Sequence, residues 1–537
     1  MRPAYKDLYF GKSDSRNEVN DDRDEFVKSY VDLNGAVEAV TSGRAFLILG
    51  PKGTGKSALA WYLSAAETAG THLALVRDAA NLPLAEIPRL QTGQAEGPER
   101  TVTAWKFILL CSYLELLLRD HGCKLRNERE VLRIAKILRD FGFMGDASGR
   151  ALVRASSTTI TIPLPSLGQI YKKENRASLN IFNLIPYMER WVAEAQSETR
   201  HVLVLDGLDS IFLNDTLYDE SLSSLVQAAY SLNQILREHQ ATGSVALLIR
   251  NDVFARVALS LPDSQKMRDD LSIDLDWRVL SGQAGVNAPL MQLVNAKAAR
   301  ALDLERVDVL SYFPEKITVG QRSPGDPKRI PTFQYLLNMT RHTPRDLLRL
   351  FEEIRKVESS GLYGDGGETL ADEVIHEGVL KYSAKYFVGA IQNEFAGFEG
   401  GPEQASAALS ALKFMNAQTF DRKDFEGALA EVSSMAEGQT DSLLQLLFYA
   451  GAIGNYLPSH NESHMQFFHR RDETQIYLKG HFILHHALIH AWGLKRSRGS
   501  SLREGNSSSR LAPNSQEPRR RRNRTRGGRP IERGPGE

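Results

Sequence analysis

Short apolar runs separated by helix-forming stretches characterise the first 300 residues. Each run holds only a few residues, which is typical of buried strands rather than of long helices. The runs that predict strands are residues 44–50, 73–76, 202–205 and 245–249, with a further candidate at 273–277. The stretches that predict helices are residues 57–66, 102–120, 128–141, 181–195 and 222–237. Strands that alternate with helices predict an α/β fold in which helices cover both faces of a parallel sheet.

The pattern is mainly helical after about residue 330. Predicted helices are residues 333–339, 345–357, 370–395 and 442–456. Two short strands, 465–468 and 474–477, are expected to form a hairpin. Helices followed by a short hairpin predict a winged-helix domain.

These changes of pattern divide the chain into five expected parts. The parts are an N-terminal segment (1–43), an α/β core (44–300) with a helical insertion at about 77–200, a helical lid (301–395), a winged-helix-like domain (396–494) and a tail (495–537). The tail is rich in Ser, Arg, Pro and Gly and has almost no apolar residues, so we expect it to be disordered.

The charge balance separates the tail from the rest of the chain. The 537 residues include 66 basic and 66 acidic side chains, and 42% of them are hydrophobic, which excludes wholesale disorder. The tail alone holds 13 basic and four acidic residues, so a mildly acidic body carries a basic extension.

Cysteine use and apolar length point to the cytoplasm. Cys111 and Cys123 form no C-x-x-C pair and no zinc spacing, so we expect reduced, buried thiols. The first 25 residues contain no apolar leader. The longest apolar runs are interrupted by polar and charged residues and are too short to span a bilayer, so no membrane attachment is expected.

A glycine-rich motif follows the first predicted strand. It matches G-x-x-x-x-G-K-[ST] and consists of Gly50, Pro51, Lys52, Gly53, Thr54, Gly55, Lys56 and Ser57. In this strand-to-helix context the motif predicts a P-loop NTPase sheet, whose loop amides and helix start bind phosphates. Lys56 is expected to reach the β and γ phosphates, and Ser57 to bind Mg²⁺. The alternative is a glycine-rich turn with a coincidental Lys-Ser. No Asn-Lys-x-Asp sequence occurs, which favours ATP over GTP.

Two aspartates follow the third predicted strand. Asp206 ends the strand and would lie beside the phosphate loop, where an acid supports Mg²⁺. Asp209, three residues later, is placed to polarise the attacking water. The alternative for Asp209 is a helix N-cap or turn residue.

Two arginines are candidate sensors of the nucleotide. Arg250 follows the strand at 245–249 and would face the γ phosphate. Its alternative is a structural ion pair with Asp252 or Asp209. Arg345 follows Pro344 at a predicted helix start and could reach over a nucleotide from the lid. The alternative for Arg345 is a pair with the next residue, Asp346, or simple exposure to solvent.

The assembled motifs resemble the AAA+/STAND division of P-loop ATPases. More narrowly, Tyr9-Phe10-Gly11, the phosphate loop and Arg250-Asn-Asp252 look like a poorly characterised bacterial P-loop ATPase family labelled FunZ. The resemblance implies a nucleotide site at residues 50–57, Mg²⁺ support by Asp206, a catalytic acid at Asp209 and sensor roles for Arg250 and Arg345. Related proteins usually have glutamate in place of Asp209, which implies slow, switch-like hydrolysis. By analogy the switch would serve phage defence or DNA transactions.

The basic tail suggests nucleic acid as a partner. It has seven arginines between Arg519 and Arg529, and if all of them neutralised DNA phosphates the slope of log K against log[salt] would be roughly −6. The alternative is a solvated extension without a partner. A rival function is therefore a nucleotide-gated DNA-binding protein, resembling origin-recognition ATPases, with little turnover. A small-molecule kinase is a third candidate, which the helical C-terminal half disfavours. The sequence leaves a homo-oligomer or an unknown protein partner open.

Overall fold

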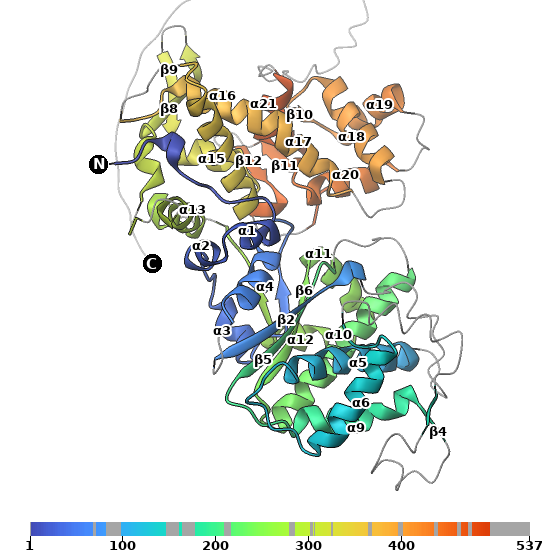
Figure 1. Ribbon diagram of the computed structural model, residues 1–537. Helices are drawn as coiled ribbons and strands as arrows, with labels where there is room; N and C mark the ends of the chain where they lie inside the picture. The colour runs from blue at the N-terminus through green and yellow to red at the C-terminus, as the bar shows by residue number, and fades with distance from the viewer. Residues whose placement is uncertain are drawn as a thin grey trace, which may run out of the picture. The chain divides into compact units, whose positions relative to one another are not determined.

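The fold is described from a computed structural model (Figure 1). It describes residues 2–67, 71–81, 98–145, 161–163, 178–208, 216–278, 285–300, 304–305, 307–323, 326–363, 368–395, 401–433, 439–458, 463–470 and 475–494. Asp209 and the basic tail, including residues 519–529, lie outside the described residues.

A five-stranded parallel sheet forms the centre of the α/β region. Its strands are β1 (Leu47–Leu49), β2 (His72–Asp78), β5 (Arg200–Asp206), β6 (Gly243–Ile249) and β7 (Ser272–Asp274). The strand order is β2-β5-β6-β1-β7, and every neighbouring pair is parallel. The predicted parallel sheet is thus confirmed, although the fifth strand ends at Asp274 rather than at residue 277.

Both faces of this sheet are buried, as the continuous apolar runs predicted. Ile48 and Leu248 belong to one core, whereas Leu47 and Leu247 belong to the other, because successive strand residues point to opposite faces. The first core includes residues of α3 (Ala36–Thr41) and α4 (Lys56–Ala65). The second core includes residues of α5 (Pro98–Leu117), α6 (Glu128–Asp140), α9 (Ile185–Ala193) and α10 (Thr216–Glu238).

The N-terminal segment joins the first core rather than standing apart from it. It contains the short helices η1 (Tyr5–Asp7), α1 (Ser15–Asp21) and α2 (Arg23–Lys28). The Tyr5 hydroxyl donates to the Phe351 carbonyl at 3.1 Å, and the Phe10 ring stacks on the Phe351 ring with centroids 5.5 Å apart. Residues near the start of the chain therefore pack on a helix more than 300 residues away.

A helical region follows the sheet. Its elements are α13 (Pro289–Arg300), η8 (Val309–Tyr312), α14 (Thr332–Asn338), α15 (Pro344–Ser359), α16 (Asp372–Tyr382), a π-helical turn (Ser383–Phe387) and α17 (Val388–Gln392). The sequence predicted the helices from α14 to α17, but it predicted neither α13 and η8 nor the antiparallel hairpin of β8 (Lys316–Ser323) and β9 (Asp326–Pro331). Three charged residues and two prolines make β9 polar along most of its length, so it gives no apolar strand signal.

The C-terminal region combines helices with a small antiparallel sheet. Its helices are α18 (Gly401–Met415), α19 (Arg422–Val432), α20 (Thr440–Tyr449) and α21 (His486–Trp492). Its strands are β10 (Thr419–Phe420), β11 (Ile453–Pro458), β12 (Ser463–Gln466) and β13 (His481–Leu484), in the order β10-β13-β11-β12.

The predicted hairpin in this region was misplaced. The helix expected over 442–456 ends at Tyr449, because Gly451 adopts a left-handed φ of 78° and the chain then enters β11. The strand partner of β12 is β11, and residues 475–477 form no strand. The sequence predicts one helix here because the apolar residues of β11 follow those of α20 after only three residues.

The described helices have no segment that could cross a bilayer. None of them is both long enough and apolar enough to do so.

Candidate functional site

The phosphate loop connects β1 to α4. Gly53 and Gly55 have φ values of 84° and 94°, which side-chain-bearing residues rarely adopt. A Cβ atom on Gly50 would lie 2.6 Å from the Thr54 hydroxyl. Because Gly55 precedes α4 and has no side chain to cap it, the first amides of this ten-residue helix remain available to an anion.

Lys56 is held against its own loop. The side chain is buried, and its ammonium group donates to the carbonyls of Gly50 at 2.9 Å and Pro51 at 3.1 Å. Thr54 also donates to the Pro51 carbonyl at 2.9 Å, and the Trp277 indole donates to the Thr54 carbonyl at 2.7 Å. These bonds fix the curve of the loop and keep the Lys56 charge beside it.

A cavity of about 220 Å³ opens over the loop. Its lining includes residues 52–56 of the loop, Ser57 and Asp206. Asp206 ends β5, and β6 separates that strand from β1, so the aspartate reaches the loop across one intervening strand. Serine and carboxylate oxygens are the ligands that Mg²⁺ prefers, so this donor set fits the expected metal.

Much of the remaining lining of the cavity is apolar or aromatic. The residues of this kind are Phe26, Tyr30, Val31, Leu33, Leu275, Trp277, Leu293 and Leu348. They come from the N-terminal segment, the chain after β7, α13 and α15. An apolar and aromatic surface in the same cavity as a phosphate site fits a nucleobase.

A buried ion pair lines the same cavity. Lys297 on α13 donates to Glu18 on α1 at 2.7 Å, and its ammonium lies 4.8 Å from the Phe26 ring centre. Burial lowers the pKa of Lys297, and the Glu18 carboxylate opposes that shift. Glu18, Lys297 and Trp277 were not predicted from the sequence, because none of them belongs to a recognisable motif. Tyr9-Phe10-Gly11 alone marked the N-terminal segment.

Arg250 lies beside the loop but is bound by carboxylates. It follows Ile249, whose register partner is Leu49, so it is next to the loop's first residue. Its guanidinium makes two bonds to Asp252, at 2.9 and 3.0 Å, and lies 3.0 Å from Glu394. Although burial raises the pKa of Asp252, the Arg250 guanidinium holds that pKa below its ordinary value. The pair with Asp252 expected as an alternative is therefore present.

Arg345 contacts the loop through its backbone. Its amide donates to the Gly53 carbonyl at 3.3 Å, and its side chain lines the cavity. A Cβ atom on Gly53 would meet the Thr343 hydroxyl at 3.3 Å, so the start of α15 lies directly against the loop. The expected alternative of an Arg345–Asp346 pair does not match the described bonds of Asp346, whose carboxylate is bound by Arg341.

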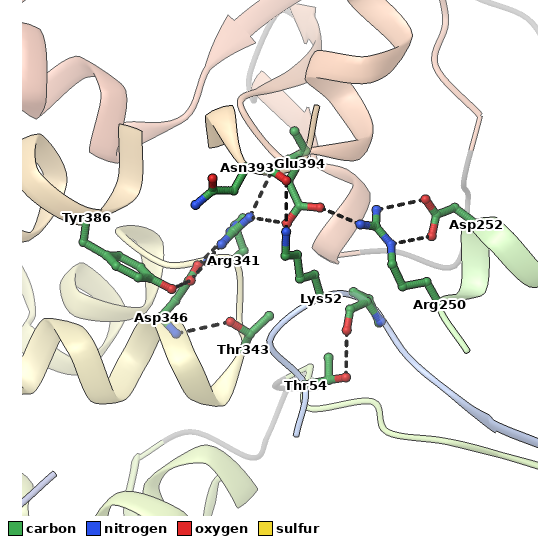
Figure 2. A network of polar contacts seen from close by, with 12 residues as sticks. Lys52, Thr54, Arg250, Asp252, Arg341, Thr343, Asp346, Tyr386, Asn393 and Glu394 are labelled. Carbon is green, nitrogen blue, oxygen red and sulfur yellow. Dashed lines mark hydrogen bonds and ion pairs between the residues drawn. The ribbon is translucent and has the colours of Figure 1, made fainter. Parts of the chain in front are cut away.

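A chain of charged side chains connects the loop flank to the helical region (Figure 2). Arg341 makes two bonds to Asp346, at 2.8 and 2.9 Å, and a third to Glu394 at 3.2 Å. Tyr386 donates to Asp346 at 2.9 Å. Although burial raises the pKa of Asp346, the Arg341 guanidinium holds it below the ordinary value. Glu394, which bridges Arg341 and Arg250, was not anticipated from the sequence.

The fold and site together define a class. A parallel sheet whose first strand leads through G-x-x-x-x-G-K-S into a helix, with an acid ending another strand at the same cavity, is consistent with a P-loop NTPase fold.

Comparisons with known proteins add little detail. No protein-family model and no curated protein matches the sequence. Among solved structures, the chain is similar to the Walker-type ATPase PABY2304 of Pyrococcus abyssi, with 12% identity and a TM-score of 0.33. The similarity covers 86% of this chain and 97% of that chain. Since this TM-score is too low to support an assignment, the class rests on strand order and loop geometry.

Proposed function

We propose that the protein is a Mg²⁺-dependent ATPase of the AAA+/STAND type that hydrolyses ATP slowly. The observation that carries the proposal is the cavity whose lining combines Lys56, Ser57 and Asp206 with apolar and aromatic side chains. The first group suits a Mg²⁺-bound triphosphate, and the second suits the base.

Each residue has a role that follows from its position. The loop amides and the start of α4 bind phosphate oxygens, and Lys56 stabilises their charge. Ser57 and Asp206 would hold Mg²⁺, which neutralises charge on the phosphates when bound. Asp209 orients the attacking water in this proposal, a role that rests on its place in the sequence. Arg345 would respond to the terminal phosphate from the start of α15.

The hydrolysis test uses the full-length protein. Mg·ATP binding is measured by calorimetry and phosphate release by a coupled assay, for wild type and for Lys56→Ala, Asp206→Asn and Asp209→Asn. Lys136→Ala, on an exposed position of α6, is the matched control. We expect wild type and the control to bind and hydrolyse ATP, and Lys56→Ala to lose both. If wild type bound ATP without turnover, hydrolysis under these conditions would be excluded. If Lys56→Ala bound ATP as tightly as wild type, the proposed site would be rejected.

The contact between α15 and the loop supports a conformational switch. A bound phosphate changes the surroundings of Gly53, whose carbonyl accepts the Arg345 amide. Any shift of this carbonyl is transmitted to α15. Hydrogen exchange of the first turn of α15 should therefore differ between the ADP-bound and ATP-bound protein. Identical exchange in the two states would contradict the switch.

DNA binding is a second candidate function. The order α18-β10-α19-α20-β11-β12-β13, with three antiparallel strands after the third helix, favours a winged-helix domain. With the basic tail, this domain would hold DNA while the nucleotide controls access to it. Removing residues 495–537 should reduce the affinity for double-stranded DNA and its salt dependence. Unchanged affinity would exclude the tail as the anchor, and stimulation of ATPase activity by DNA would link the two functions.

A further inference from the structure

Two cations beside the phosphate loop are bound by one dipeptide at the end of α17 (Figure 2). The Lys52 ammonium donates to the Asn393 carbonyl at 2.9 Å, and the Arg250 guanidinium lies 3.0 Å from Glu394. Lys52 belongs to the loop and lines the nucleotide cavity, while Arg250 follows the strand next to it. The end of α17 is therefore fastened to the side of the proposed phosphate site by two positive charges.

Glu394 has a second partner that keeps it in place if Arg250 leaves. Arg341 donates to its other oxygen at 3.2 Å, and Arg341 is itself bound through two hydrogen bonds to Asp346. Arg250 likewise keeps its two bonds to Asp252. Breaking only the contact between Arg250 and Glu394 thus leaves no buried charge without a partner, which removes the main cost of separating a buried ion pair.

We infer that Glu394 competes with the terminal phosphate of ATP for Arg250, and so acts as a positioning residue that sets the preference between ATP and ADP. The inference rests on the proposed function, since it needs a nucleotide in the cavity. A phosphate offers an arginine more negative charge and more acceptor oxygens than a carboxylate does. ADP lacks the terminal phosphate and leaves Arg250 with Glu394.

This competition connects nucleotide state to the chain beyond α17. Transfer of Arg250 to phosphate removes one of the two bonds that connect residues 393–394 to the side of the loop, and the other comes from Lys52, which lines the cavity. The cost of separating the end of α17 from the loop then offsets part of the binding free energy of the terminal phosphate. Removing the negative charge of Glu394 should lower this cost and strengthen the binding of ATP.

The test compares two nucleotides on Glu394→Gln. Gln keeps the size of the side chain and removes its charge. Calorimetry measures the Kd of Mg·ADP and of the Mg²⁺ complex of the β,γ-imido analogue of ATP. We expect the analogue to bind roughly tenfold more tightly than to wild type, while the Kd of ADP changes less than about twofold. If Glu394 had a purely structural role, the substitution would weaken the binding of both nucleotides together or lower Tm. The ratio of the two Kd values would then stay the same.

Two further variants make the result decisive. In an Arg250→Ala background, Glu394→Gln should no longer change the ratio of the two Kd values, because the competitor has lost its target. Glu394→Asp, which withdraws the carboxylate by one methylene, should change the ratio in the same direction and covers the case in which the Gln variant folds poorly. Glu377→Gln, on α16 and paired with a half-exposed lysine, is the matched control.

Two outcomes overturn the inference in different ways. If wild type binds both nucleotides through Lys56 but Glu394→Gln and Glu394→Asp keep the wild-type ratio, the competition is rejected and the ATPase proposal stands. If wild type binds neither nucleotide, both proposals fail.

Discussion

The two flanks of the phosphate loop hold their cations by different means. On the cavity flank, the described hydrogen bonds of Lys56 go to backbone carbonyls, which carry partial charges only. On the outer flank, Arg250 and Arg341 face the carboxylates of Asp252, Asp346 and Glu394. Lys56 is therefore fastened to the loop that would bind the phosphates, whereas Arg250 and Arg341 are fastened to acidic side chains outside the loop. Substitutions on the cavity flank should therefore affect mainly nucleotide binding, and substitutions on the outer flank should affect mainly stability.

The largest loss of stability should come from the outer flank. Asp346 is fully buried, so Asp346→Asn leaves the buried Arg341 guanidinium without its main counter-charge. We expect the free energy of unfolding in urea to fall by about 3–5 kcal/mol. Asp269→Asn, exposed on α12 (Ser264–Asp270), should stay within about 0.5 kcal/mol of wild type. A loss below about 1 kcal/mol for Asp346→Asn would break the contrast between the flanks.

The cavity flank should show the opposite behaviour. Lys56→Ala removes the bonds to the Gly50 and Pro51 carbonyls among its contacts, and we expect the free energy of unfolding to fall by about 1–3 kcal/mol, less than for Asp346→Asn. Mg·ATP affinity should fall by two to three orders of magnitude, on the order of 3–4 kcal/mol, because the loop loses its buried cation. Titration calorimetry and urea unfolding of the same sample separate the two effects. A variant that unfolds readily would show that Lys56 serves the fold instead.

Acid should lower the stability of the protein through the ion pairs of the outer flank. The pKa values of Asp346 and Asp252 are held below the ordinary value of 3.8 in the folded protein. The unfolded chain binds protons at higher pH than these groups do, so their contribution is complete above about pH 4 and is lost as the pH falls through the lower folded values. Urea unfolding between pH 7 and pH 3 should show this loss, and the decline should be shallower in Asp346→Asn. If the free energy of unfolding fell equally steeply with pH in both proteins, Asp346 would be excluded as a source of the acid sensitivity.

The smallest expected effect concerns Trp277, whose indole donates a hydrogen bond to the phosphate loop. Trp277→Phe keeps the apolar ring but removes the bond to the Thr54 carbonyl. Stability should fall by about 1 kcal/mol, and the Kd of Mg·ATP should rise roughly fivefold as the loop loosens. Trp191→Phe, on α9 in the opposite core, controls for the loss of a buried tryptophan. Equal nucleotide affinity in both variants would show that the indole bond does not order the loop.

The sequence was sufficient for the sheet and the loop because both are encoded locally. Four fully apolar strands end at conspicuous polar or glycine residues, and the loop motif has a fixed spacing. The partners of Arg250 required more information. Glu394 lies 144 positions further along the chain, and no periodicity relates the two residues. The Glu18–Lys297 pair was hidden for the same reason, because it depends on how α1 and α13 meet in three dimensions.

Local ambiguity explains the remaining errors. β11 continues the apolar character of α20, and only the backbone of Gly451 marks the change. β9 consists mostly of charged residues and prolines, so alternation of apolar residues could not identify it as the partner of β8.

The bond between Tyr5 and the Phe351 carbonyl also has a consequence for folding during synthesis. Synthesis proceeds from the N-terminus at about 5–20 residues per second, so Tyr5 and Phe10 wait roughly 17–70 seconds before Phe351 is synthesised. Until then their rings have no aromatic partner from α15 and remain available to chaperones or to other nascent chains. Replacing Tyr5 and Phe10 together should therefore lower the yield of soluble protein at fast expression more than at slow expression.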